Sequence, residues 1–257
     1  MSKIRHIFFD IDNTLTDNVN NVLPSSVKPA LDRLAEEGYL LSIATGRDLK
    51  AISDEVMDLV DWFSVITFNG QIIYDRDLKC IHRRPMDRDS VRQAMKVADE
   101  TGMTLELKTE FHNFRYNDAN ESYLRTYEFF NMDPWPKDTL KENEEVIAMI
   151  ASSDTDDYEG LRKIEGLEVF VTEHHYADVN LRGMSKYEGV KFLQGYYGFS
   201  EYIAFGDSMN DYEMLENATV SVAMGDAEDK VKEICTYVTE PAGKDGLAKM
   251  VPVIESL

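Results

Sequence analysis

Two aspartates near the start of the chain, Asp10 and Asp12, are the residues whose type and spacing first indicate chemistry. They directly follow a short apolar run at 7–9, and turn-forming polar residues follow them, which is typical of a buried strand that ends in a loop. Ligands of parallel α/β sheets bind just beyond the carboxyl ends of the strands. Because two neighbouring carboxylates repel each other, we expect a divalent cation that prefers oxygen ligands, Mg²⁺, to bind there. An ordinary Asp-rich turn would explain the same residues.

A second acidic loop, far along the chain, favours the cation site over an ordinary turn. Asp207, Asn210 and Asp211 follow another apolar run, at 202–205, and open a helix-like segment. Asp207 and Asp211 are four positions apart, so they face the same side of a helix start. Carboxylates that converge from two strand ends therefore predict a cation site.

Residues suited to an anion lie between the two acidic loops. Thr45 and Gly46 end a third apolar run, where glycine lets the backbone approach an anion and the hydroxyl and backbone N–H groups can donate to it. Lys186 lies near the start of an amphipathic segment and offers an ammonium group. Each signal is weak alone, because a Thr-Gly pair is usually a turn and a single lysine is usually a solvated surface charge. Their order among the acidic loops favours a phosphate site.

Taken in chain order, these residues resemble the four signature motifs of the haloacid dehalogenase superfamily. The motif residues are Asp10-x-Asp12-x-Thr14, Thr45-Gly46-Arg47, Lys186 and Gly206-Asp207-x-x-Asn210-Asp211. The pattern is most similar to the Cof-like branch, which carries a large α/β cap between the second and third motifs. Residues 68–70, 222–225 and 238–246 also fit that branch. The chain departs from it at Asn13, where the family commonly has glycine, and at Asp226, where asparagine is common.

The resemblance implies a role for each motif residue. Asp10 would attack a phosphomonoester as the nucleophile and form an aspartyl-phosphate, and Asp12 would act as general acid and base. An acid at position 12 implies rapid turnover of that intermediate. Mg²⁺ would be held by Asp10, the backbone carbonyl of Asp12 and Asp207, with Asp211 in support. The residues expected to orient and neutralise the phosphoryl group are Thr45, Gly46, Lys186 and Asn210.

The activity that the resemblance implies is a Mg²⁺-dependent phosphatase for small phosphorylated metabolites, with sugar phosphates as the first expectation. One alternative is a phosphomutase, or a phosphatase dedicated to one glycosyl-phosphate or nucleotide. Another is a phosphometabolite-binding protein that has lost turnover. Every position expected to do chemistry keeps a competent residue, which speaks against the silent protein.

Composition sets outer bounds on the protein class. The 257 residues, 43% hydrophobic and 29% charged, are typical of a globular protein and not of a disordered one. A formal charge of −21 argues against a nucleic-acid or anionic-membrane partner, because phosphate groups require a basic face. No apolar stretch approaches the ~20 residues of a membrane helix, and the start leaves no room for a signal-peptide core. With two isolated cysteines, Cys80 and Cys235, these features predict a cytoplasmic protein. We also expect a monomer or a homodimer.

Strand-like and helix-like segments alternate along the chain, which indicates βαβ units. We expect a helix with its apolar face at Val27 and Leu31, a second helix capped by Asp48 that runs to about residue 60, and a hairpin at 71–84. Residues 86–181 change to an αββαβαββ order. The predicted fold is α/β, with a Rossmann-like, doubly wound, mostly parallel core (1–85 and 182–257) and an inserted α/β cap (86–181). The resemblance implies that this cap sets substrate specificity.

A pair of histidines, His174 and His175, invites a metal interpretation. Adjacent residues of a strand point to opposite faces of a sheet, so this pair cannot readily chelate one ion, and we expect structural or surface roles. The alternative is that one of them reaches from the cap toward the substrate, together with Asp178, Asn180 and Arg182.

Overall fold

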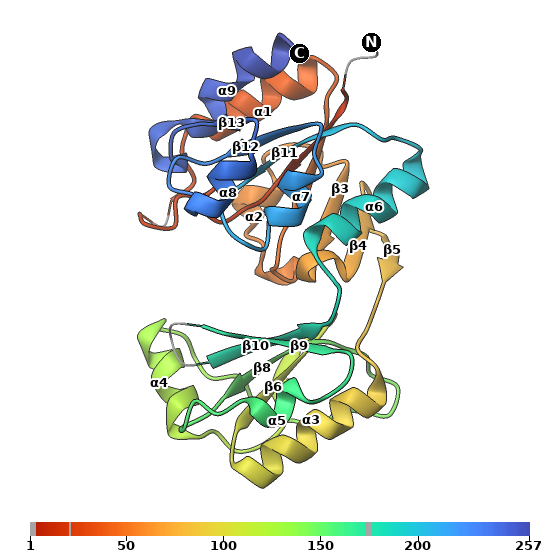
Figure 1. Cartoon of the computed structure of the whole chain (residues 1–257), viewed down its shortest axis with the longest axis vertical. Coiled ribbons are helices and arrows are strands. Elements are labelled where there is room, and N and C mark those ends of the chain that lie inside the picture. Colours follow the sequence, from red (N-terminus) through yellow and green to blue (C-terminus); the bar gives the residue numbers. More distant parts are fainter. Residues whose placement is uncertain (1–3, 21, 173–175) are drawn as a thin grey trace. The chain divides into compact units, whose positions relative to one another are not determined.

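The computed structural model describes residues 4–20, 22–172 and 176–257, and it divides the chain into two compact units (Figure 1). The first unit consists of Met1–Arg83 and Met184–Leu257, and the second consists of Arg84–Gly183. Each unit has its own sheet and its own buried apolar core.

An eight-stranded sheet forms the centre of the first unit, in the order β13-β12-β11-β1-β2-β3-β4-β5. Pairing is parallel from β13 through β3, and β4 and β5 add an antiparallel edge. The strands are β1 (His6–Phe9), β2 (Leu40–Ala44), β3 (Ser64–Thr67), β4 (Ile72–Asp75), β5 (Cys80–Arg83), β11 (Tyr202–Gly206), β12 (Val220–Ala223) and β13 (Tyr237–Val238). The sheet runs outward from β1 in both directions, so the order reverses beside β1 as in doubly wound folds. The predicted fold class is confirmed.

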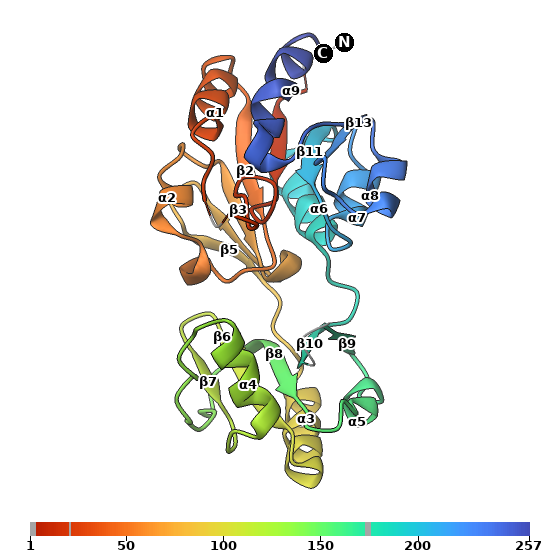
Figure 2. The ribbon, with the colours of Figure 1, turned by 90° about the vertical axis from the view of Figure 1, so that its left-hand side faces the viewer.

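Helices cover both faces of this sheet (Figure 2). Helices α1 and α9 lie side by side, and α1 buries Val27, Ala30, Leu31 and Leu34 as its apolar spacing predicts. Helices α6, α7 and α8 contribute Val190, Met214 and Val231 to a core cluster with Phe8 of β1. The helical elements of this unit are α1 (Val27–Glu36), α2 (Asp54–Met57), α6 (Lys186–Tyr197), α7 (Tyr212–Glu216), α8 (Asp229–Ile234), α9 (Gly246–Glu255) and the short turns η1 (Leu49–Ala51), η2 (Phe68–Gly70) and η3 (Ala242–Lys244).

The single helix expected from Asp48 to about residue 60 is wrong. Asp48 caps only the short turn η1, where its side chain accepts from the backbone N–H of Ala51. Ile52 is extended, and Ser53 then caps α2 by accepting from the N–H of Val56. The Asp48 and Ser53 side chains each bond a nearby backbone N–H and each start a separate short helical element, because such local bonds compete with a continuous helix.

The second unit is an antiparallel sheet in the order β7-β6-β8-β10-β9. Helices α3 and α5 contribute Val91, Ala94 and Leu161 to the core cluster that includes Leu105 and Met149 of the sheet. Its elements are α3 (Arg88–Thr101), β6 (Thr104–Thr109), β7 (Asn113–Arg115), α4 (Glu121–Phe129), β8 (Val146–Ser152), α5 (Glu159–Arg162), β9 (Leu167–Val171) and β10 (Tyr176–Leu181). This is the αββαβαββ order that the sequence predicts. Across the residues that the structure describes, we find no helix with the length and apolarity of a membrane crossing.

Candidate active site

The two acidic loops come together because β1 and β11 are neighbours in the parallel sheet. Phe9 pairs with Phe205, so both strands end at the same edge of the sheet. Asp10 extends this pairing by one bond, from its N–H to the carbonyl of Phe205 at 3.1 Å. The chain therefore delivers Asp10 and Asp207 to one place from positions nearly 200 residues apart, at the edge where ligands of such sheets bind.

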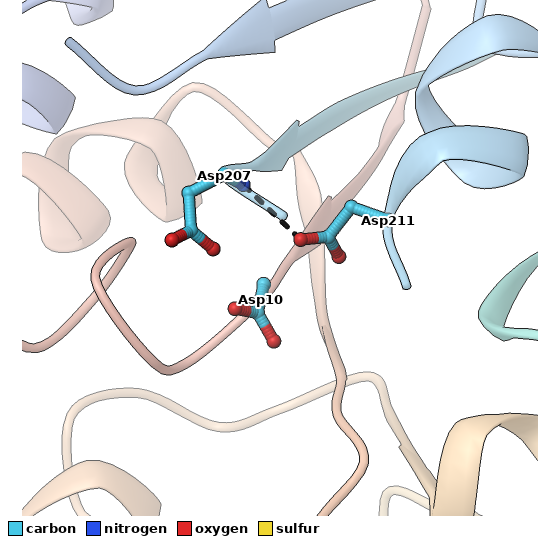
Figure 3. Close-up of side chains that lie close together, drawn as sticks. All are labelled: Asp10, Asp207 and Asp211. Atoms are coloured by element: carbon cyan, nitrogen blue, oxygen red, sulfur yellow. Dashed lines mark hydrogen bonds between the residues drawn. The ribbon is translucent and has the colours of Figure 1, made fainter. Parts of the chain in front are cut away.

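Three carboxylates form a compact buried group at this edge, Asp10, Asp207 and Asp211 (Figure 3). One oxygen of each lies within 4.8 Å of the others. The loop after β11 folds around Asp211, whose Oδ2 accepts from the backbone N–H groups of Asp207 at 3.1 Å and Ser208 at 3.2 Å. The first of these bonds is the dashed line in Figure 3. A side chain at Gly206 would lie 2.5 Å from Asp211 Cγ, so the close approach requires glycine there.

Lys186, the first residue of α6, places its ammonium group inside this carboxylate group. Its Nζ lies 2.5 Å from Asp10 Oδ1 and 2.7 Å from Asp211 Oδ1, and its side chain is fully buried. Burial acts to lower the pKa of Lys186, but the charges of Asp10 and Asp211 raise that pKa overall. The lysine is therefore a permanent cation between two carboxylates.

The buried carboxylates are short of positive charge. Burial raises the pKa of Asp10 well above its usual range, against the attraction of Lys186. Burial, with the charge of Asp211 added, raises the pKa of Asp207 to about 7. Three carboxylates against one ammonium leave an excess of negative charge in a desolvated place, and oxygen ligands of this kind are those that Mg²⁺ takes. The residues present fit the predicted cation.

Asp12, the expected general acid and base, lies beside the carboxylate group and bonds a different cation. Its Oδ2 accepts from Arg47 Nε at 2.9 Å, and its Oδ1 accepts from Arg47 Nη2 at 2.5 Å and from Asn18 Nδ2 at 2.9 Å. Burial raises the pKa of Asp12, but the bonds from Arg47 and Asn18 outweigh it and lower that pKa. These bonds therefore favour the carboxylate form of Asp12, which must take up a proton before it can act as an acid.

The residues expected to bind phosphate differ in their burial and in their hydrogen-bond partners. Thr45 is buried just after β2, and its hydroxyl accepts from the N–H of Arg47 at 3.1 Å. Gly46 is exposed, and a side chain there would lie 3.1 Å from Asn69 Oδ1. Asn210 is also exposed, and its Oδ1 accepts from the hydroxyl of Ser208 at 2.7 Å. Asn210 therefore bonds its own loop, whereas Lys186 lies inside the carboxylate group.

Asn13 is a site residue whose role the sequence reasoning missed. Its Nδ2 donates to Asp207 Oδ2 at 3.2 Å, and its Oδ1 accepts from the N–H of Asn18 at 3.2 Å. Its φ is 55°, a conformation that suits glycine and that asparagine tolerates better than most residues. The departure from the glycine common at this position was the available signal.

Of the second-unit residues considered for substrate contact, His174 and His175 lie outside the described residues. Arg182 donates to the carbonyl of Leu167 at 2.8 and 3.1 Å, a bond between the ends of neighbouring strands. Burial raises the pKa of Asp178, against the charge of Lys108. The Arg182 side chain is therefore engaged in a contact within the second-unit sheet. Asp178 differs from it in having a raised pKa.

Comparisons with known proteins agree on one family. The profile of the haloacid dehalogenase-like hydrolases matches residues 7–251. The pyridoxal phosphate phosphatase YbhA of Escherichia coli (strain K12) is 29% identical over 273 residues, covering 96% of this chain and 97% of that protein. The 5-amino-6-(5-phospho-D-ribitylamino)uracil phosphatase YitU of Bacillus subtilis (strain 168) is 25% identical over 272 residues, covering 98% and 97%. Among solved structures, the HAD subclass IIB sugar phosphatase BT4131 superposes with a TM-score of 0.80 at 28% identity, covering 98% of this chain and 100% of that one.

Proposed function

The chain belongs to the haloacid dehalogenase-like hydrolases, and we propose that it is a Mg²⁺-dependent phosphatase that works through an aspartyl-phosphate on Asp10. It is a phosphoric monoester hydrolase of this family. The observation that carries the proposal is the buried contact of Lys186 with Asp10 and Asp211, beside Asp207. A nucleophile, a permanent cation and a set of oxygen ligands meet there within a few ångströms.

In the proposed reaction Asp10 attacks the phosphorus of the bound monoester. The bond from phosphorus to the ester oxygen breaks, and the departing alcohol takes a proton from Asp12. In the second step Asp12 takes a proton from water and the water oxygen attacks phosphorus. The bond between phosphorus and the Asp10 oxygen breaks, which releases inorganic phosphate and restores the Asp10 carboxylate. Lys186 orients Asp10 through the bond to Oδ1 and neutralises charge on the phosphoryl group.

The metal would be held by Asp10, Asp207 and the backbone carbonyl of Asp12, with Asp211 in support. When bound, Mg²⁺ supplies positive charge that stabilises the negative phosphoryl oxygens in the transition state. Thr45 and Gly46 would donate to those oxygens from the end of β2. In this proposal Asn210 also donates, which requires its amide to turn away from Ser208.

The proposed substrates are small phosphomonoesters, with sugar phosphates first. The sugar phosphatase BT4131 supports this choice, because it aligns over 98% of this chain. The names of YbhA and YitU describe other small phosphomonoesters, so what the relatives share is the phosphoryl group and not the rest of the substrate. We assign the choice of substrate to the second unit, as an inserted cap.

The decisive experiment replaces the nucleophile. Asp10→Asn should abolish release of phosphate from 4-nitrophenyl phosphate and from a panel of sugar phosphates, with circular dichroism unchanged. Asp61→Asn, at an exposed position of the same unit, is the matched control and should keep full activity. Activity in Asp10→Asn would overturn the mechanism. Isomerised sugar phosphate without free phosphate in the wild type would instead identify a mutase.

A further inference from the structure

Arg47 and Asp12 form a two-pronged contact. Both carboxylate oxygens of Asp12 are engaged by one guanidinium group, through Nε at 2.9 Å and Nη2 at 2.5 Å. Such a fork fixes the plane of the carboxylate as well as its distance, which the single ammonium of a lysine cannot do.

Arg47 is itself anchored. Its Nη1 donates to the carbonyl of Ala51 at 3.1 Å, and its backbone N–H donates to the hydroxyl of Thr45 at 3.1 Å. Its own carbonyl accepts from the N–H of Phe68 at 3.0 Å. The loop after β2 therefore fixes the position of the guanidinium, and the guanidinium in turn fixes the position of the Asp12 carboxylate.

The pair lies at the border of the buried site. Each of the two side chains is 35% exposed, whereas Lys186 is fully buried. Ion pairs with this much exposure contribute little to folding stability, because solvent screens them. A purely structural purpose therefore explains the fork poorly, and its exposure leaves it accessible to a leaving group or a water molecule.

We propose that Arg47 is a positioning residue that orients Asp12 for both of its proton transfers. The inference rests on the proposed function, in which Asp12 protonates the alcohol and then activates water. A proton donor or acceptor must lie within hydrogen-bond reach of the reacting oxygen, and a small displacement of the catalytic group lowers the rate steeply.

The test uses leaving groups that differ in their need for a proton. Arg47→Met should lower kcat/KM for an alkyl phosphate such as a hexose 6-phosphate by about 100-fold, within the 10²–10⁴-fold range of general acid–base catalysis. For 4-nitrophenyl phosphate kcat/KM should change only a few-fold, since nitrophenolate leaves without protonation. Its kcat should still fall, with a burst of one nitrophenolate per enzyme, because the second step also needs Asp12.

The companion variant is Asp12→Asn. If Arg47 acts through Asp12, adding Arg47→Met to Asp12→Asn should cause no further loss. Arg33→Met is the matched control, because Arg33 also donates from two nitrogens to one carboxylate, that of Glu255. This variant should leave the activity toward both substrates unchanged. If Arg47→Met does not fold, Arg47→Lys should show the same split between substrates at smaller size.

The outcomes separate the two proposals. Equal losses for both leaving groups, or losses that multiply with Asp12→Asn, overturn the role of Arg47 while leaving the phosphatase intact. Activity that survives in Asp10→Asn overturns the proposed function and this inference with it.

Discussion

Lys186 Nζ lies 2.5 Å from Asp10 Oδ1, although 176 positions separate the two residues in the chain. The side chains are 0% and 4% exposed, so neither charge has water as an alternative partner. A buried charge that loses its partner is costly, whereas the intact pair roughly balances its own desolvation. The same contact that would activate the nucleophile therefore also joins the end of β1 to the start of α6.

Replacing this lysine should cost both activity and stability. Lys186→Met removes the ammonium group that contacts both Asp10 and Asp211 and leaves these buried carboxylates uncompensated, so we expect a loss of about 3–5 kcal/mol in the free energy of unfolding. Urea unfolding measures it. Lys28→Met is the control, because the pair of Lys28 with Asp32 is about half exposed and should be worth less than ~1 kcal/mol. Similar losses in both variants would contradict the buried-pair argument.

Removal of the metal should be visible without any assay of turnover. Mg²⁺ should raise the melting temperature of the wild type by mass action, and EDTA should reverse that rise and stop phosphate release. Asp207→Asn replaces one of three buried carboxylates with a neutral amide, a weaker ligand for Mg²⁺, so reaching the same rise should need at least ~10-fold more Mg²⁺. Asp61→Asn should respond as the wild type does. A response of Asp207→Asn equal to that of the wild type would remove Asp207 from the metal set.

Asn13 offers a test of what its amide does for Asp207. Asn13→Gly keeps the backbone at positive φ but removes the 3.2 Å bond to Asp207 Oδ2. We expect the Mg²⁺ concentration for half-maximal thermal stabilisation to rise by about tenfold. This is the lower end of the roughly 10–100-fold loss of metal affinity that is typical when a residue that orients a metal ligand is replaced. Asn131→Gly is the control, since Asn131 has a φ of 52° and is exposed in the second unit. Equal shifts in the two variants would mean that the amide has no such role.

Acid should destabilise the first unit through His6. This ring stacks on Phe199 with centroids 3.6 Å apart, and burial lowers its pKa from 6.5 to about 4. The unfolded chain therefore binds the proton more readily than the folded one, so stability is fully present above pH 6.5 and falls as the pH drops toward 4.

The measurement for His6 is urea unfolding at several pH values in that window. His6→Phe keeps an aromatic ring against Phe199 and cannot take a proton, so its stability should depend less on pH than that of the wild type. Parallel pH profiles for the two proteins would show that other groups carry the acid sensitivity.

The elements of the core could be predicted because apolar runs and the acidic loops after them carry local signals. The strand ends at Asp10 and Asp207 follow from such runs, and the doubly wound sheet follows from their alternation with helices. The broken helix after Asp48 could not be read from apolar spacing, because Ile52 and Val56 have helical spacing even though a second cap at Ser53 interrupts them.

The contacts of individual site side chains were less predictable than the elements. Arg47 bonds Asp12, which lies 35 positions away in the sequence. The residues around Arg47 in the sequence do not indicate which carboxylate its guanidinium will bind. Asn210 was expected to face phosphate, yet in the structure it bonds Ser208, two residues away, an option open to any short amide in a loop. Such choices depend on distances that only the folded chain defines.

The parallel pairing of β1 with β11 has a consequence for synthesis on the ribosome. His6 of β1 pairs with Tyr202 of β11, which is translated 196 residues later. Strand β1 therefore leaves the ribosome long before this neighbouring strand exists. At roughly 5–20 residues per second, that delay is about 10–40 s. During it the second unit, whose strands are all contributed by Arg84–Gly183, has its complete sequence available to fold, while one edge of β1 stays open. A nascent chain halted before Tyr202 should therefore carry a complete second unit together with an aggregation-prone, unfinished first sheet until the last fifth of the chain is made.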